Sequence, residues 1–261
     1  MRIALVQCSP RASLALAVSS LTTFITQAKA QQASLLIVPE MFLTGYNIGA
    51  EACRAQALSL QDPRFQALQA LAREHQIALV IGFPERDQDT IYNSAAFIDE
   101  QGQVLGRYRK THLYGSVDQA QFSAGISLCQ PFTWQCWQCA LAICYDIEFP
   151  EVARSYALQG VELLLVPTAN MHPFDLVCRH IIPTRAAENT LYIAYANYVG
   201  REDPFEYCGQ SCICDPSGQV LARANSDAEI LLLAELDKAT LQTARESLTY
   251  LTDRRSHLYQ L

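Results

Sequence analysis

The sequence predicts an α/β protein built as a four-layer sandwich, in which two sheets pack face to face and helices cover their outer sides. Short apolar runs alternate with longer amphipathic stretches from residue 2 onward. The second half of the chain weakly repeats the first, at a spacing far too long for a solenoid. No Pro-, Gly- or Ser-rich linker divides the chain, so we expect a single domain over residues 1–261.

The first half carries five strand-like and two helix-like segments. Strands are predicted where short apolar and β-branched runs stand between turn residues, and helices where apolar residues recur every three to four positions. The predicted strands are residues 2–7, 34–38, 77–82, 91–98 and 103–109. The predicted helices are residues 14–33 and 61–75. The sequence DEQG at 99–102 predicts a hairpin turn, because its glycine suits the turn conformation.

The second half follows the same order of strand, helix, strand and hairpin. Its predicted helices are residues 151–159 and 183–189, and its predicted strands include residues 163–166 and 191–196. LLIVP at 35–39 matches LLLVP at 163–167, and DEQGQVLGR at 99–107 matches DPSGQVLAR at 215–223. These matches predict two similar sheet-plus-helix units packed sheet to sheet. The tail, residues 241–261, is expected to dock on a neighbour through its late aromatic and apolar residues.

The composition indicates a compact protein that acts on small molecules. Half of the 261 residues are hydrophobic and only 17% are charged, so a chain of this length buries a large core without a disulfide or metal staple. A net charge of −7 disfavours nucleic acid and anionic membranes as partners. No apolar run approaches the roughly 18 residues of a membrane span, and no signal peptide opens the sequence. We therefore expect a cytoplasmic protein whose ten cysteines are mostly buried thiols.

Three segments place a reactive side chain where an apolar strand gives way to a loop, which is where ligands bind in α/β sheets. Glu40 follows a strand in VPEMF, where apolar surroundings would raise its pKa toward that of a general base. Lys110 ends a strand in YRKTH, with His112 expected on the same face. Cys144 stands between a strand and a helix start, where backbone N–H groups favour a thiolate. Taken singly, each also fits a structural role, as a strand cap, a solvated strand end or a packing thiol.

Together, these segments resemble the signatures of the nitrilase superfamily of carbon–nitrogen hydrolases. They are PEMFLTGY at 39–46, YRKTHL at 108–113 and ICYDIEFPE at 143–151. The resemblance spans essentially the whole chain, through VPTAN at 166–170 and RAAEN at 185–189. It implies an α-β-β-α sandwich, a homodimer or higher homo-oligomer formed through the helical faces, and a catalytic triad of Glu40, Lys110 and Cys144. It implies neither a cofactor nor a metal.

The residue types of this triad can hydrolyse a primary amide. Cys144 attacks the carbonyl as a thiolate, while the Lys110 ammonium and the backbone N–H of Tyr145 stabilise the oxyanion. Glu40 takes the thiol proton, passes it to the leaving ammonia and then activates the water that cleaves the thioester. Many family members carry a second glutamate that supports the lysine. Asp118 stands at the matching offset here, one methylene shorter, and is expected to act through a closer backbone or through water.

Within the superfamily, the loops around the predicted site are similar to those of the 5-aminopentanamidases of bacterial lysine degradation. The implied reaction converts 5-aminopentanamide and water to 5-aminopentanoate and ammonia. The residues available to bind the substrate ammonium or to position the substrate are Tyr46, Tyr145, Glu148, Asn170 and Asp175. An ω-amidase acting on keto-acid amides would need an arginine clamp instead, for which the candidates are Arg179, Arg185 and Arg201. An N-carbamoyl amine hydrolase is a further alternative.

Other classes of protein fit the sequence less well. Cys136 and Cys139 have a C-x-x-C spacing, but alternation along a predicted strand points them to opposite faces. A second cysteine group shares one face of a predicted strand without a nearby histidine, which disfavours zinc; it consists of Cys208, Cys212 and Cys214. The cysteine signature of papain-like proteases is absent. A non-enzymatic scaffold would require loss of a triad member, and all three members are present.

Overall fold

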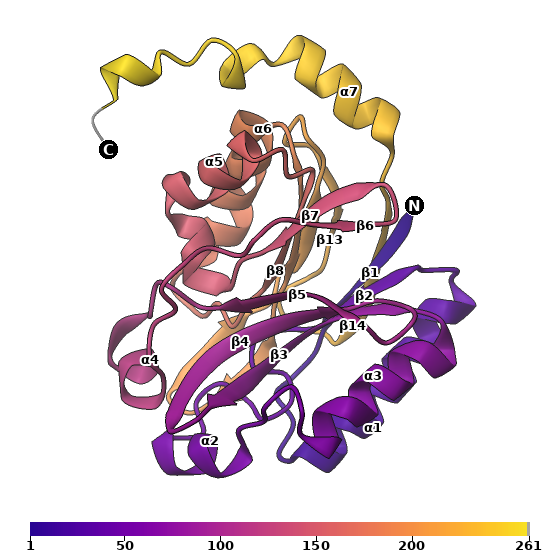
Figure 1. Cartoon of the computed structure of the whole chain (residues 1–261), viewed down its shortest axis with the longest axis vertical. Coiled ribbons are helices and arrows are strands. Elements are labelled where there is room, and N and C mark those ends of the chain that lie inside the picture. The colour runs from indigo at the N-terminus through magenta and orange to yellow at the C-terminus, as the bar shows by residue number, and fades with distance from the viewer. Residues whose placement is uncertain (260–261) are drawn as a thin grey trace.

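The structure, a computed structural model that describes residues 1–259, contains two six-stranded sheets packed face to face. Helices α1 and α3 cover the outer side of one sheet, and α5 and α6 cover the outer side of the other (Figure 1). The predicted four-layer α/β sandwich is confirmed. The helices are α1 (Leu14–Ala30), α2 (Ala50–Gln56), α3 (Pro63–His75), α4 (Gly115–Gln121), α5 (Pro150–Leu158), α6 (Ile182–Asn189) and α7 (Lys238–Ser247).

The first sheet has the strand order β14-β1-β2-β3-β4-β5. Its strands are β1 (Arg2–Gln7), β2 (Leu35–Ile37), β3 (Ala78–Asp87), β4 (Thr90–Ile98), β5 (Val104–Arg109) and β14 (Ile230–Glu235). β1, β2 and β3 run parallel, and the other strands pair antiparallel. Both faces of the sheet are buried: Ile3 and Leu5 face the second sheet, whereas Ala4 and Val6 face the helices. This explains why the central strands have continuous apolar sequences.

The second sheet has the strand order β13-β12-β9-β8-β7-β6. Its strands are β6 (Phe132–Trp134), β7 (Trp137–Leu141), β8 (Leu163–Pro167), β9 (Tyr192–Ala196), β12 (Cys212–Cys214) and β13 (Val220–Arg223). In the order β7, β8, β9, β12, β13 these strands correspond to β1 through β5, so the weak sequence repeat is a structural repeat. The second half also carries a separate hairpin of β10 (Val199–Glu202) and β11 (Phe205–Cys208) between β9 and β12.

The two copies of the repeated hairpin turn are stabilised in the same way. Asp99 Oδ1 accepts hydrogen bonds from the backbone N–H groups two and four residues later, at 3.0 and 2.7 Å. Asp215 Oδ1 does the same at 2.8 and 2.9 Å. Gly102 and Gly218 complete the two turns with φ values of 79° and 85°, a conformation that glycine adopts without steric cost.

Two predicted element ends are wrong for identifiable reasons. The helix predicted over residues 14–33 ends at Ala30, because Gln32 adopts a left-handed φ of 60° and the N–H of Ala33 bonds back to Ala28 O at 2.9 Å. The strand predicted over residues 77–82 continues to Asp87. A Cβ at Gly82 would lie 2.5 Å from a backbone nitrogen of the loop after β2, so this glycine marks a close approach of two chain segments.

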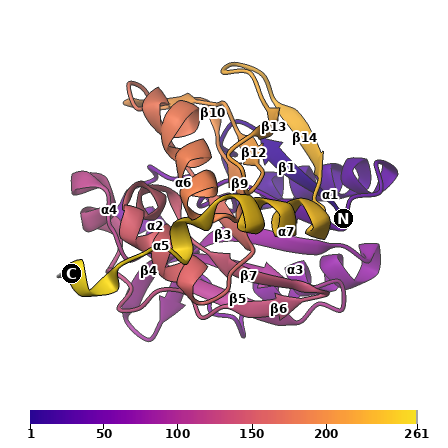
Figure 2. The ribbon, with the colours of Figure 1, turned by 90° about the horizontal axis from the view of Figure 1, so that it is seen from above.

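The tail packs partly on its own chain. α7 runs across one end of the molecule (Figures 1 and 2), and Arg245 Nη2 donates to Val161 O at 3.2 Å. Tyr250, Leu258 and Tyr259 are exposed, so docking of this outer part on a neighbour stays a prediction; residues 260 and 261 lie outside the described residues. No helix within residues 1–259 is both long enough and apolar enough to cross a membrane.

Candidate active site

The carboxyl ends of β2 and β8, which are equivalent strands of the two repeats, meet at one place. The chain continues from β2 into Glu40 and from β8 into Thr168. The backbone N–H of Glu40 donates to Thr168 O at 3.3 Å. Side chains that follow either strand therefore share the same space, as expected at the carboxyl edge of parallel strands.

Glu40 is completely buried at this point. Its Oε1 accepts hydrogen bonds from Lys110 Nζ at 2.8 Å and from Asn93 Nδ2 at 2.6 Å. Its Oε2 has no hydrogen-bond partner among the described residues. Burial raises the pKa of Glu40, although the Lys110 ammonium opposes the shift. One carboxylate oxygen is therefore fixed, and the other can accept a proton.

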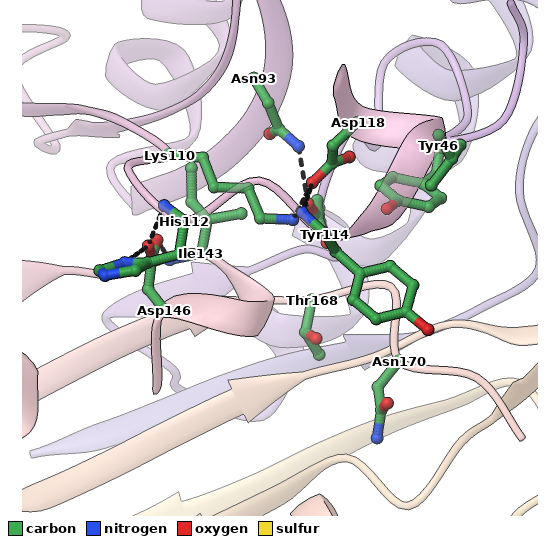
Figure 3. Close-up of polar contacts among 12 residues, drawn as sticks. Tyr46, Asn93, Lys110, His112, Tyr114, Asp118, Ile143, Asp146, Thr168 and Asn170 are labelled. Carbon is green, nitrogen blue, oxygen red and sulfur yellow. Dashed lines mark hydrogen bonds and ion pairs between the residues drawn. The ribbon is translucent and has the colours of Figure 1, made fainter. Parts of the chain in front are cut away.

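Lys110 lies between two carboxylates, of which Figure 3 labels that of Asp118. Its Nζ is 2.8 Å from Glu40 Oε1 and 2.7 Å from Asp118 Oδ2, and all three side chains are buried. Burial alone would lower the pKa of Lys110, but the Asp118 and Glu40 carboxylates outweigh it and hold the pKa well above its ordinary value. The lysine is therefore an ammonium ion that points between the two acids.

Asp118 reaches the lysine directly. It stands in the short helix α4, and the same Oδ2 that contacts Lys110 accepts a hydrogen bond from the backbone N–H of Tyr114 at 2.8 Å. Of the two arrangements that the sequence leaves open, the structure has the closer backbone and not a bridge through water. Although aspartate is one methylene shorter than glutamate, it reaches Lys110 because α4 holds its backbone close to the lysine.

Cys144 stands at a sharp turn between β7 and α5. Its φ of 48° lies in the left-handed region, which is uncommon for a residue with a Cβ, and the 3₁₀ turn Cys144–Glu148 begins with it. The first N–H groups of such a turn have no partner within it, so they can donate to an oxyanion.

The surroundings of Cys144 oppose the thiolate that the turn alone favours. Burial raises the pKa of the thiol, the Glu40 carboxylate raises it further, and the Lys110 ammonium opposes this only in part. The pKa therefore lies well above that of a free cysteine. A neutral thiol in this position needs a general base before it can attack a carbonyl.

A buried carboxylate that the sequence analysis missed, Asp146, ties the turn of the cysteine to the loop of the lysine. Its Oδ2 accepts a hydrogen bond from the backbone N–H of Ile143 at 3.0 Å. Its Oδ1 accepts from Thr111 Oγ1 and from the backbone N–H of His112, each at 3.0 Å (Figure 3). Asp146 was visible within ICYDIEFPE, but nothing in the sequence indicates which loop it contacts.

The expectation that Lys110 and His112 share a face is also wrong. β5 ends at Arg109, so the two-residue alternation of a strand does not extend to these positions. His112 stacks on Phe149 with ring centroids 4.1 Å apart, and its Nδ1 lies 2.8 Å from Asp146 Oδ1, on the side away from the Lys110 ammonium (Figure 3).

The sequence analysis does not single out two further polar residues of the site, although one of them, Thr168, stands in the VPTAN segment. Asn93, on β4, is buried and donates to Glu40 Oε1, although its position in a strand suggests nothing beyond sheet packing. Thr168 is buried beside Cys144, where its hydroxyl helps to lower the thiol pKa, and it also donates to Tyr195 Oη at 3.1 Å. Both residues become functional candidates only through long-range contacts.

Cys144 opens into a cavity of about 200 Å³. This volume lies below the range typical of drug-sized ligands, so the cavity suits a small molecule. The walls contain four aromatic residues and one carboxylate; they consist of Tyr46, Tyr114, Cys144, Tyr145, Glu148, Ala169, Asn170, Met171 and Phe174. Four of the five predicted substrate-contacting residues therefore lie in these walls. Tyr114 packs edge-on against Tyr145 and Phe174, with ring centroids 5.4 and 5.8 Å away.

Glu148 is the carboxylate in these walls. Burial raises the pKa of Glu148 to about 7, with Lys110 and Arg185 opposing the shift. Arg185 Nη2 donates to the backbone carbonyl of Glu148 at 2.9 Å rather than to its side chain. The carboxylate is therefore free to face a ligand, and it changes its charge near neutral pH.

Asp175 lies outside the cavity walls. Its Oδ2 is 2.9 Å from His172 Nδ1, and its Oδ1 accepts a hydrogen bond from Gln210 Nε2 at 2.8 Å. These contacts keep its side chain on neighbouring loops. The expectation that Asp175 positions the substrate is therefore not supported by its placement.

The three candidate arginines also lie elsewhere. Arg179, Arg185 and Arg201 pair with nearby acidic residues at 3.6, 3.0 and 3.4 Å. Within residues 1–259, no arginine side chain lines the cavity next to Cys144. A carboxylate at the far end of a substrate would therefore meet Glu148 rather than a guanidinium group.

The other cysteines are not arranged as the sequence suggested. Cys136 lies exposed in the tight turn between β6 and β7, so it does not share a strand with Cys139. Cys208 ends β11, whereas the other two cysteines of its group stand on β12; its Sγ lies 3.8 Å from Cys178 Sγ. In both places the chain turns where strand alternation was assumed. No group of three or more potential metal ligands exists in the described part of the chain.

Comparisons with known proteins agree with this geometry. The family model described as "Carbon-nitrogen hydrolase" matches residues 2–246. The "Hydrolase in pqqF 5'region" of Pseudomonas protegens is 47% identical over 260 residues, which cover 99% of this chain and 90% of that protein. An (R)-stereoselective amidase of Pseudomonas sp is 39% identical over 225 residues, which cover 85% and 79%.

A solved structure of an amidase is similar to this chain in fold. The amidase from Nesterenkonia sp. AN1 superposes with a TM-score of 0.85 at 33% identity, covering 99% of this chain and 98% of that one. One structure of that amidase shows Michael addition of acrylamide at its active site cysteine, and another holds butyramide.

Proposed function

Because the chain belongs to the carbon–nitrogen hydrolase family and is an amidase of that family, we propose that it hydrolyses a short aliphatic primary amide through a thioester on Cys144. The observation that carries this proposal is the buried cluster of Glu40, Lys110 and Asp118, of which Glu40 and Lys110 act electrostatically on Cys144, a residue that lines a small cavity. The cluster contains a base and a fixed cation beside a nucleophile.

In the first half-reaction, the free oxygen of Glu40 takes the proton of the neutral Cys144 thiol as sulfur attacks the amide carbon. The Lys110 ammonium and the N–H groups that begin the turn after Cys144 stabilise the oxyanion. The C–N bond breaks when Glu40 returns the proton to nitrogen, and ammonia leaves. The raised pKa of Glu40 supports this role, because a stronger base takes a thiol proton more readily.

In the second half-reaction, Glu40 removes a proton from water, which attacks the thioester at the same carbonyl carbon. The thiolate leaves, takes the proton back and returns as the neutral thiol, and the product is a carboxylic acid. Every proton moves through a single carboxylate, and the neighbouring ammonium keeps its own proton because its pKa is held high. The cycle therefore needs only the amide and one water molecule.

For the substrate, we propose an amide with a terminal ammonium group, and specifically 5-aminopentanamide. Support comes from Glu148, whose carboxylate lies in the cavity wall with Tyr114 and Phe174. A carboxylate beside aromatic faces is a suitable environment for an alkylammonium ion. An ω-amidase for keto-acid amides is the weaker candidate, because the arginines that it would need lie outside the cavity.

A panel of amides tests the charge preference. We expect kcat/KM for ammonia release from 5-aminopentanamide to exceed that from pentanamide by at least about tenfold, which is the scale of one desolvated ion pair. The monoamide of glutaric acid, which carries a carboxylate at the far end, should be the poorest substrate. A preference for the carboxylate amide would contradict the cationic substrate and leave the amidase chemistry intact.

Glu148→Gln is the matched control for the same panel. In this variant, 5-aminopentanamide and pentanamide should have nearly equal kcat/KM values, because the substitution removes the charge and keeps the shape.

In the wild type, kcat/KM for the cationic amide should also rise as the pH increases through about 7, since Glu148 becomes charged there. The ratio of the kcat/KM values for the two amides reports the titration of Glu148 alone, because the catalytic groups affect both amides equally.

A comparison of the two acids that hold Lys110 tests their different roles. Glu40→Gln should lower kcat by at least about a hundredfold, because it removes the general base. Asp118→Asn should lower kcat less, because Asp118 contacts the lysine and not the reacting sulfur. Both substitutions keep side-chain volume, and steady-state kinetics with circular dichroism as a folding control will compare them. Equal losses would show that Asp118 takes part in the chemistry itself.

The setting of the reaction belongs to the same proposal. Ten free cysteines fit a reducing compartment such as the cytoplasm. Release of 5-aminopentanoate would place the enzyme in lysine degradation. A homodimer formed through the helical faces also stays a prediction, which light scattering can test.

A further inference from the structure

The hairpin β10–β11, which by strand register is equivalent to the outer part of the β3–β4 hairpin, contacts a wall of the substrate cavity. Met171 forms a bridge with Tyr207 on β11, and the N–H of Cys208 donates to Asn170 O at 3.1 Å. Met171 and Asn170 both line the cavity. The hairpin therefore fixes the wall that comes from the second repeat.

One carboxylate of the same hairpin contacts the cavity wall that the first repeat supplies. Glu202, the last residue of β10, accepts hydrogen bonds at Oε2 from the backbone N–H groups of Tyr46 at 3.0 Å and Asn47 at 2.8 Å. Tyr46 also lines the cavity. Gly45 permits this approach, because a Cβ at that position would clash with Glu202 Oε1.

Tyr207 connects the two contacts. Its hydroxyl donates to the same Oε2 of Glu202 at 2.6 Å, while its backbone pairs with Met171. Burial and the adjacent Glu202 carboxylate raise the pKa of Tyr207, so the phenol keeps its proton and remains a donor. A single oxygen with three donors thus links Tyr46 on one wall to Met171 on the other.

We propose that Glu202 is a positioning residue that sets the width of the cavity and thereby the length of amide chain that the enzyme accepts. The proposal rests on the amidase function proposed above. Glu202 makes no hydrogen bond to Glu40, Lys110, Asp118 or Cys144 within the described residues, so its removal should change the fit of the substrate more than the rate of the chemical steps.

The test is Glu202→Gln, which keeps the shape and removes the charge that three donors share. For 5-aminopentanamide, we expect KM to rise about tenfold and kcat to change by less than about threefold. The ratio of kcat/KM values between this amide and its shorter and longer homologues should fall toward one. Glu206→Gln is the matched control, because its side chain on the same hairpin is exposed and pairs with Arg201 at 3.9 Å. Its kinetics should equal those of the wild type.

Tyr207→Phe removes one of the three donors and should shift KM and chain-length preference in the same direction by a smaller factor. It also carries the test if Glu202→Gln does not fold. Unchanged KM and unchanged preference in either folded variant would overturn the proposal, as would a fall in kcat at constant KM.

Alkylation of Cys144 separates this proposal from the proposed function. Mass spectrometry can compare the rates at which iodoacetamide and its N-hexyl derivative alkylate this thiol. We expect Glu202→Gln to bring the ratio of these two rates closer to one by at least about threefold. If the wild type hydrolyses no amide while the ratio still narrows, the proposed reaction fails and the positioning role stands. If amides are hydrolysed and the ratio does not move, only the positioning role fails.

Discussion

Ammonia release is expected to fall by at least about a thousandfold in Cys144→Ala, while the fold is retained. The loss follows from chemistry, since no second thiol lines the cavity within residues 1–259. The fold should persist because alanine meets the same left-handed backbone that the cysteine already adopts at φ 48°, and because the deleted atom faces a cavity. The measurement is steady-state ammonia release, with the melting temperature as the control for folding.

Cys136→Ala is the matched control for this variant. Cys136 is exposed in a hairpin turn far from the cavity walls, so its loss should leave kcat unchanged. Rapid acid quenching of the wild type with substrate should also trap an acyl group on the peptide that contains Cys144, and mass spectrometry will locate it. Full turnover by Cys144→Ala, or an acyl group on a different cysteine, would remove the basis of the proposed mechanism.

The parts of the fold that the sequence predicts are those encoded locally or by repetition. LLIVP and LLLVP are apolar runs that end in proline, and the structure places both as equivalent central strands that lead into Glu40 and Thr168. The paired DxxGQVL segments form turns with the same aspartate hydrogen bonds. Such features depend on side-chain period and turn chemistry, which neighbouring residues determine.

The parts that the sequence does not predict are contacts between residues that lie far apart in the chain. Asp146 stabilises a loop 34 residues away in sequence, and Asn93 reaches Glu40 across 53 residues. Neither contact has a periodic signal, because each depends on the tertiary arrangement of strands and loops. The same limit applies to the charge of Cys144: the local turn favours a thiolate, whereas burial beside the Glu40 carboxylate, a tertiary effect, raises the thiol pKa.

Lys110→Met should remove activity and also destabilise the protein. In the wild type the ammonium compensates two buried carboxylates at 2.8 and 2.7 Å. Without it, Glu40 and Asp118 face each other in the interior, and the loss of one partner of a buried ion pair typically costs about 3–5 kcal/mol. We therefore expect kcat to fall by at least about a hundredfold and the free energy of unfolding to fall by an amount in that range at pH 8.

The pH dependence of this loss identifies its cause. In Lys110→Met, the ammonium that opposes the raised pKa of Glu40 is gone, so burial and the Asp118 carboxylate hold this pKa further above its ordinary value in the folded state. A raised pKa stabilises the folded state at low pH, and that contribution is lost as the pH increases through the folded-state pKa. The difference in free energy of unfolding between wild type and Lys110→Met should therefore be smaller at pH 5 than at pH 8, as measured by urea unfolding.

A second substitution separates the structural role of Lys110 from its chemical role. Asp118→Asn in the Lys110→Met background removes one of the two unpaired charges, so most of the lost stability at pH 8 should return. Activity should not return, because no cation is left to stabilise the oxyanion. If the double variant regained ammonia release together with stability, the lysine would be needed only to hold two acids in place, and the oxyanion would depend on the backbone N–H groups after Cys144 alone.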